Sequence, residues 1–140
     1  MAGSDLSENS SSPKKPISLH PLAGFDSRPI TRVVFGPGTL SQLGALVREL
    51  GGKRVLLVTD PGLESAGHPQ RAVEYLNKSG LEVTLFDGVQ ENPTSCHVSH
   101  GVAIAQRCKV DFLVAIGGGS SMDTAKGINF ILTNGGQIAD

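Results

Sequence analysis

Short apolar runs separated by stretches of helical periodicity predict a regular alternation of strands and helices. Consecutive apolar residues at Arg54–Thr59 and Phe112–Ile116 are typical of parallel strands buried on both faces. Two runs rich in β-branched and aromatic residues, at 31–35 and Glu82–Phe86, predict two further strands. Sharp turns follow them, as at Gly36-Pro37-Gly38, so each strand has a defined end.

The segments between these strands predict four helices. The first is expected from Thr39 as N-cap, in a capping box with Gln42, to a stop at Gly51. The others are expected over 69–79, 94–108 and 121–133. Their inward residues are expected to be Leu40, Leu43, Val47, Leu50, Ala72, Val73, Leu76, Val98, Val102 and Ala105. Strands alternating with helices predict an α/β fold, an open parallel sheet with flanking helices.

Composition divides the chain into two parts. Residues 1–28 are rich in serine and proline and are predicted to be a disordered tail, whereas 29–140 form the α/β domain. The formal charge of −1 gives no basic field to attract nucleic acid or an anionic membrane. No apolar run approaches the roughly 18 residues that a membrane span requires.

The two cysteines of the chain indicate the redox state of its cellular compartment. Cys96 and Cys108 are expected on one helix, about 18 Å apart, too far for a disulfide. Free thiols fit a reducing compartment, and the chain is predicted to be cytoplasmic, with no membrane or nucleic-acid partner.

The segment from Gly117 to Lys126 carries the most chemistry. Gly117, Gly118 and Gly119 follow a buried strand and leave no Cβ between the backbone and an approaching ligand. Ser120 and Ser121 then offer hydroxyls at a helix start, where free N–H groups and the helix dipole favour an anion. This arrangement predicts a phosphate cradle, although three glycines can also serve a tight strand-to-helix turn.

Polar residues follow two other strands at the same edge of the predicted sheet. Asp60 and Asn92 suit a dinucleotide, with the Asp60 carboxylate on the ribose, which favours NAD over NADP. Both residues are also ordinary turn formers. Asp123 is predicted either to cap its own helix or to touch the cofactor, and Lys126 is expected in solvent.

Other site types fit the sequence poorly. A P-loop and the usual dinucleotide fingerprint both need glycine where this chain has Met122. His97 and His100 are spaced to share a metal, but no carboxylate accompanies them at helical spacing. They are interpreted as surface residues, and no metal ligand is predicted in this chain.

The order of four motifs resembles the iron-containing (group III) alcohol dehydrogenase family, which shares its fold with glycerol dehydrogenase and dehydroquinate synthase. The last motif matches the family's Gly-Gly-Gly-Ser-x-x-Asp-x-Ala-Lys without a mismatch. In chain order the motifs are Val34-Phe-Gly-Pro-Gly38, Val58-Thr-Asp-Pro-Gly62, Asn92-Pro-Thr94 and Gly117-Gly-Gly-Ser-Ser-Met-Asp-Thr-Ala-Lys126.

The resemblance implies a function and a cofactor. It implies hydride transfer between NAD and a small alcohol or aldehyde in the full-length protein. The implied NAD contacts are Asp60, Asn92, Gly118, Gly119 and Ser120. In the family, iron or sometimes zinc is held by one Asp and three His of a helical second domain.

That second domain is expected to be missing from this chain. We therefore expect the N-terminal cofactor-binding portion of such an enzyme, truncated before its metal-binding domain and inactive by itself. The alternatives are a stand-alone nucleotide-binding module, a polyol dehydrogenase or a dehydroquinate-synthase-like lyase. The sequence leaves open whether the protein forms a homo-oligomer.

Overall fold

The computed structural model describes residues 31–138, of which residues 34–138 form one compact unit. The predicted tail over 1–28 lies outside the described residues. Within the described range, no helix combines the length and the apolar character needed to cross a membrane.

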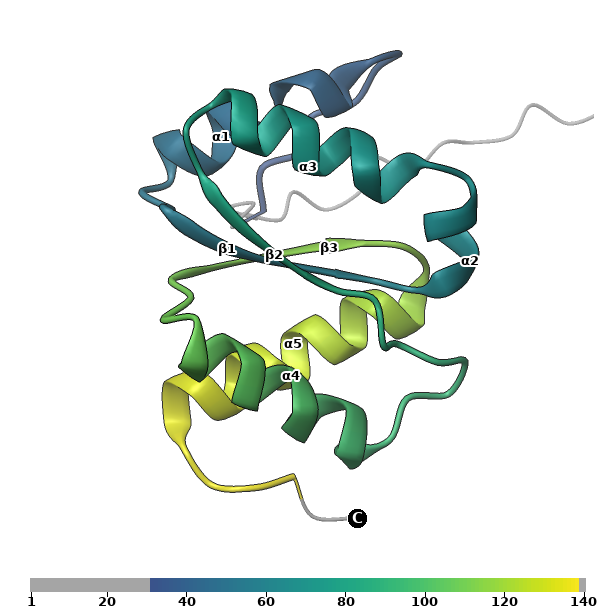
Figure 1. Ribbon diagram of the computed structural model, residues 1–140, viewed down its shortest axis with the longest axis vertical. Helices are drawn as coiled ribbons and strands as arrows, with labels where there is room; N and C mark the ends of the chain where they lie inside the picture. Colours follow the sequence, from purple (N-terminus) through teal and green to yellow (C-terminus); the bar gives the residue numbers. More distant parts are fainter. Residues whose placement is uncertain (1–30, 139–140) are drawn as a thin grey trace, which may run out of the picture. The chain divides into compact units, whose positions relative to one another are not determined.

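A three-stranded parallel sheet forms the middle of the unit (Figure 1). Its strands are β1 (Arg54–Thr59), β2 (Glu82–Phe86) and β3 (Phe112–Ile116), in the order β2-β1-β3. Val55 pairs with Val83 on one side and with Phe112 on the other. Because β1 is central and all strands run the same way, their carboxyl ends share one edge.

Helices cover both faces of the sheet (Figure 1). The short 3₁₀ helix η1 (Thr39–Gln42), α1 (Leu43–Glu49) and α3 (His68–Lys78) lie on one face. On the other face lie α4 (Ser95–Arg107) and α5 (Gly119–Asn134). A five-residue helix, α2 (Pro61–Ser65), follows β1 directly. The predicted open parallel sheet with flanking helices is confirmed.

Strand β1 separates two hydrophobic clusters because its side chains alternate between the faces. Val55 and Leu57 pack with α1 and α3, whereas Leu56 and Val58 pack with α4 and α5. All four are at most 1% exposed. The burial of β1 on both faces explains its uninterrupted apolar sequence, as parallel sheets require.

The beginning of the described chain differs from the prediction. Residues 31–35 form no strand, and Phe35 is 97% exposed. Apolar and β-branched character alone does not make a strand, because a strand also needs a neighbour for its backbone hydrogen bonds, and residues 31–35 pair with none of the three strands.

The predicted capping box at Thr39 is also wrong. The Thr39 hydroxyl donates backward to the Gly36 carbonyl at 3.0 Å, and the left-handed Gly38 precedes the 3₁₀ turn. Leu50, expected to face inward, is 68% exposed because it follows the last turn of α1.

Three other details correct the sequence analysis. β3 is only half-buried along its length because, among the described strands, it has a neighbour on one side only. α2 is absent from the prediction because five residues are too few to show a helical period. The helix predicted from Ser121 begins two residues earlier, at Gly119, with Gly118 as N-cap.

The loop before β3 is tied to β1 by one carboxylate. Asp111 Oδ1 accepts from the backbone N–H groups of Lys53 and Arg54 at 2.8 Å each, and Oδ2 pairs with the Arg54 guanidinium at 3.0 Å. Burial alone would raise the pKa of Asp111, but these donors and the nearby positive charges outweigh it and lower the pKa. The contact fixes the start of β3 beside the start of β1.

Asp111→Ala should lower the free energy of unfolding by about 0.5–1.5 kcal/mol at pH 7, because two N–H groups lose their acceptor and water replaces it only in part at this exposed site. Since the folded pKa is depressed, this contribution is present above the unfolded pKa of about 3.9 and disappears as the pH falls through the folded value. Urea unfolding of both proteins at several pH values should show the difference shrinking in acid. A constant difference down to pH 2 would contradict the assignment.

Candidate functional site

A cavity of about 440 Å³ opens at the edge where the strands end. Ligand clefts in proteins usually measure about 300–1,000 Å³, and open parallel sheets bind ligands at this edge. The lining residues come from the turns after all three strands: Asp60, Pro61, Gly62, Val89, Gln90, Glu91, Gly118, Gly119 and Ser120. Four predicted site residues, Asp60, Gly118, Gly119 and Ser120, therefore share one cavity.

Asp60 follows β1 and is the N-cap of α2. Its Oδ1 accepts from the Leu63 N–H at 3.0 Å, and Pro61 provides the fixed first φ of the helix. Its Oδ2 accepts from the Ser121 hydroxyl at 3.2 Å. Asp60 thus has the turn-forming role considered from the sequence, and it also faces the cavity.

Gly118 and Gly119 lie at the amino end of α5. A Cβ built on either glycine would have no protein atom within 4 Å, so both backbones border open space. α5 is 16 residues long, and the free N–H groups and dipole of its first turn favour an anionic group. The open backbone and the helix start are the two features from which the sequence analysis predicts a phosphate cradle, and the structure places them at the cavity.

Ser121 has a position that the sequence analysis did not foresee. Its side chain is fully buried, and it is absent from the residues that line the cavity. Its hydroxyl points instead to Asp60, 61 positions earlier in the chain. This contact links the β1 turn to the α5 turn.

Asn92 and Asp123 lie outside the cavity lining. Asn92 is exposed and has a positive φ of 56°, which suits a turn residue. Asp123 accepts from Lys126 Nζ at 3.2 Å on the exposed side of α5. In the segment before Asn92, Gln90 and Glu91 do line the cavity, although the sequence analysis did not select them.

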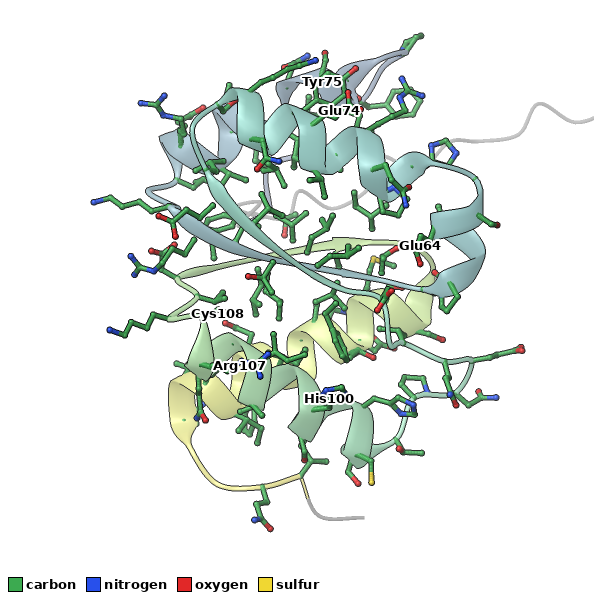
Figure 2. The ribbon with its side chains drawn as sticks, viewed as in Figure 1. Glu64, Glu74, Tyr75, His100, Arg107 and Cys108 are labelled. Carbon is green, nitrogen blue, oxygen red and sulfur yellow. The ribbon has the colours of Figure 1, made fainter. Side chains whose placement is uncertain are left out.

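The two histidines of α4 have structural contacts. His97 Nδ1 accepts from the backbone N–H of Thr94, the N-cap, at 3.0 Å. His100 packs edge-on against Phe86 of β2, with ring centroids 5.5 Å apart, and is labelled on α4 in Figure 2. No group of three His, Cys, Asp or Glu side chains that could hold a metal occurs among the residues the structure describes. Both cysteines are free thiols.

The fold and the cavity define the class of protein, an open parallel α/β domain with a ligand cleft at the carboxyl ends of its strands. The comparison with protein families is more specific: the family model for iron-containing alcohol dehydrogenase matches residues 30–140. The chain belongs to this family.

Individual relatives agree with this assignment. Alcohol dehydrogenase 4 of Schizosaccharomyces pombe is 38% identical over 95% of this chain, and 1,3-propanediol dehydrogenase of Klebsiella pneumoniae is 42% identical over 74%. The crystal structure of NADH-dependent butanol dehydrogenase A from Thermotoga maritima matches 81% of this chain, with a TM-score of 0.74 and 30% identity.

The matches cover only part of the relatives. The chain spans 30% of the Schizosaccharomyces enzyme, 27% of the Klebsiella enzyme and 29% of the Thermotoga structure. The similarity therefore extends over slightly less than a third of a complete dehydrogenase of this family.

Proposed function

We propose that this chain is the N-terminal cofactor-binding portion of an NAD-dependent dehydrogenase that acts on a small alcohol or aldehyde. The observation that carries the proposal is the cavity that joins the Asp60 carboxylate to the open backbone of Gly118 and Gly119. The family and the similarity to the NADH-dependent butanol dehydrogenase support it.

The described residues divide the binding of NAD between two walls of the cavity. The first turn of α5, with Gly118, Gly119 and Ser120, receives the pyrophosphate on backbone N–H groups. Asp60, on the β1 side, accepts from the hydroxyls of the adenosine ribose and repels a 2′-phosphate. Bound NAD supplies the hydride acceptor, and these residues bind and orient it.

The described residues do not account for the family's metal. They provide no cluster of ligands, so no step at the alcohol oxygen is assigned to them. In this proposal the chain holds the dinucleotide, while the alcohol is activated by residues belonging to the remainder of the dehydrogenase.

Asp60→Asn tests the ribose contact. Asparagine keeps the N-cap acceptor for Leu63 but removes the negative charge, so the preference for NAD over NADP should fall about tenfold or more. Calorimetric titration of the 140-residue chain with each dinucleotide measures the preference.

Asp87→Asn is the matched control. Asp87 also follows a strand and is exposed, but it does not line the cavity, so its substitution should leave both affinities unchanged. If the wild-type chain binds neither dinucleotide, the proposed function is wrong. If the Asp60→Asn chain keeps the wild-type preference for NAD over NADP, Asp60 does not contact the ribose.

A further inference from the structure

We infer that Ser121 is a positioning residue for cofactor selectivity, because its buried hydroxyl holds the Asp60 carboxylate in the orientation that admits NAD and rejects NADP. This inference rests on the proposed function and deepens it. Ser121 itself does not line the cavity, so it acts through Asp60 rather than by touching the dinucleotide.

Both oxygens of Asp60 are held by the protein. The Leu63 N–H binds Oδ1 at 3.0 Å and the Ser121 hydroxyl binds Oδ2 at 3.2 Å. With one oxygen bonded to α2 and the other to α5, rotation of the carboxylate would break one of the two bonds. A carboxylate has about four lone-pair sites, so two remain for ribose hydroxyls.

The environment of Ser121 leaves its hydroxyl little freedom. The side chain is fully buried at the third position of α5. The backbone of Gly117 lies directly above the pair: a Cβ there would overlap the Ser121 hydroxyl and would lie 2.8 Å from Asp60 Oδ2. The hydroxyl is thus enclosed next to its acceptor.

A fixed carboxylate discriminates better than a mobile one. When Asp60 cannot turn away, an incoming 2′-phosphate meets a negative charge at close range, whereas ribose hydroxyls meet oriented acceptors. Without the Ser121 bond, the carboxylate can rotate towards solvent. NAD then loses an ordered acceptor and NADP avoids part of the repulsion.

Ser121→Ala should therefore lower the affinity for NAD. The ratio of the NAD affinity to the NADP affinity should fall by about threefold to tenfold, the usual effect of losing one hydrogen bond. Thr124→Val is the matched control. Thr124 lies one turn further along α5 and is also fully buried, but its hydroxyl has no hydrogen-bond partner among the described residues. Its removal should leave the preference unchanged.

A double-mutant cycle separates positioning from a general structural effect. If Ser121 acts through Asp60, then Ser121→Ala should have no further effect on the preference in a chain that already carries Asp60→Asn. Titration with NAD and NADP, together with hydrogen exchange of the Leu63 amide, gives the readouts. Exchange at Leu63 should accelerate severalfold in Ser121→Ala but not in Thr124→Val.

Two failures are distinguishable. A wild-type chain that binds neither dinucleotide overturns the proposed function and this inference with it. A wild-type chain that prefers NAD, while Ser121→Ala keeps that preference or adds fully to Asp60→Asn, overturns the inference alone. An unchanged Leu63 exchange rate in Ser121→Ala also overturns it.

Discussion

Gly117→Ala should both destabilise the fold and weaken dinucleotide binding. Gly117 has a φ of 153°, where side chains are rarely tolerated, and a Cβ would lie 2.7 Å from the Ser121 Cβ and 2.8 Å from Asp60 Oδ2. The backbone conformation and the overlap each cost about 1–3 kcal/mol, so the free energy of unfolding should fall by at least about 2 kcal/mol. Because Ser121 and Asp60 must separate, NAD affinity should fall with it.

Gly118→Ala is the matched control for Gly117→Ala. Gly118 is the adjacent residue, but its φ of −79° suits any amino acid and its Cβ would meet no protein atom within 4 Å. The melting temperature of the Gly118→Ala variant should stay within a few degrees of the wild-type value, whereas that of the Gly117→Ala variant should fall by roughly 10 °C. Equal melting temperatures for the two variants would contradict the enclosed arrangement.

A methyl group at Gly118 has a different effect on binding. It would project into the cavity, where the proposed pyrophosphate approaches the backbone. Gly118→Ala should therefore lower the affinity for NAD while the protein remains stable. The two variants thus separate the glycine that supports the site from the one that borders the ligand.

The sheet could be predicted from the sequence because its strands carry strong local signals. β1 has uninterrupted apolar residues between polar ends, and the predicted boundaries of β1, β2 and β3 are confirmed. The long helices α3 and α4 are also confirmed as helices, with ends that differ slightly from the prediction. Three turns or more are enough for the sequence to show a hydrophobic face.

The segments that depend on distant partners could not be predicted in this way. Residues 31–35 have the composition of a strand without forming one, because pairing depends on a neighbour that the local sequence does not specify. The order β2-β1-β3, which leaves β3 half-buried, is likewise a tertiary property. An apolar run alone does not distinguish a central strand from an edge strand.

In the candidate site, too, the sequence predicts the features with a local signal but not those that depend on tertiary contacts. Gly118, Gly119 and Asp60 could be selected from the sequence because they directly follow parallel strands, whose carboxyl ends form the edge where open sheets bind ligands. The bond from Ser121 to Asp60 could not, because it joins residues far apart in the chain, and Ser120 and Ser121 look equivalent in sequence. Only the turn of α5 places Ser120 at the cavity and Ser121 in the interior.

Gly44→Ala should destabilise the chain although alanine is the better helix former. Gly44 is buried in α1, and a Cβ there would lie 2.5 Å from the Tyr75 carbonyl oxygen of α3 and would overlap the Ser79 hydroxyl. A backbone atom cannot move aside as a side chain can, so α1 and α3 must separate. The packing loss should be about 2–4 kcal/mol, which exceeds the gain of up to about 1 kcal/mol in helix propensity.

Ala45→Gly measures the propensity term in the same helix, because Ala45 is exposed and adjacent to Gly44. It should cost about 1 kcal/mol or less in urea unfolding, so both exchanges destabilise although they change propensity in opposite directions. A Gly44→Ala chain as stable as wild type would contradict the close approach of the helices. Since α1 and α3 lie across the sheet from α5, the folded Gly44→Ala chain should keep its NAD affinity, unlike Gly117→Ala. Both glycines thus support stability, whereas only Gly117 also supports binding, and measurements of stability and NAD affinity on the two variants can resolve this difference.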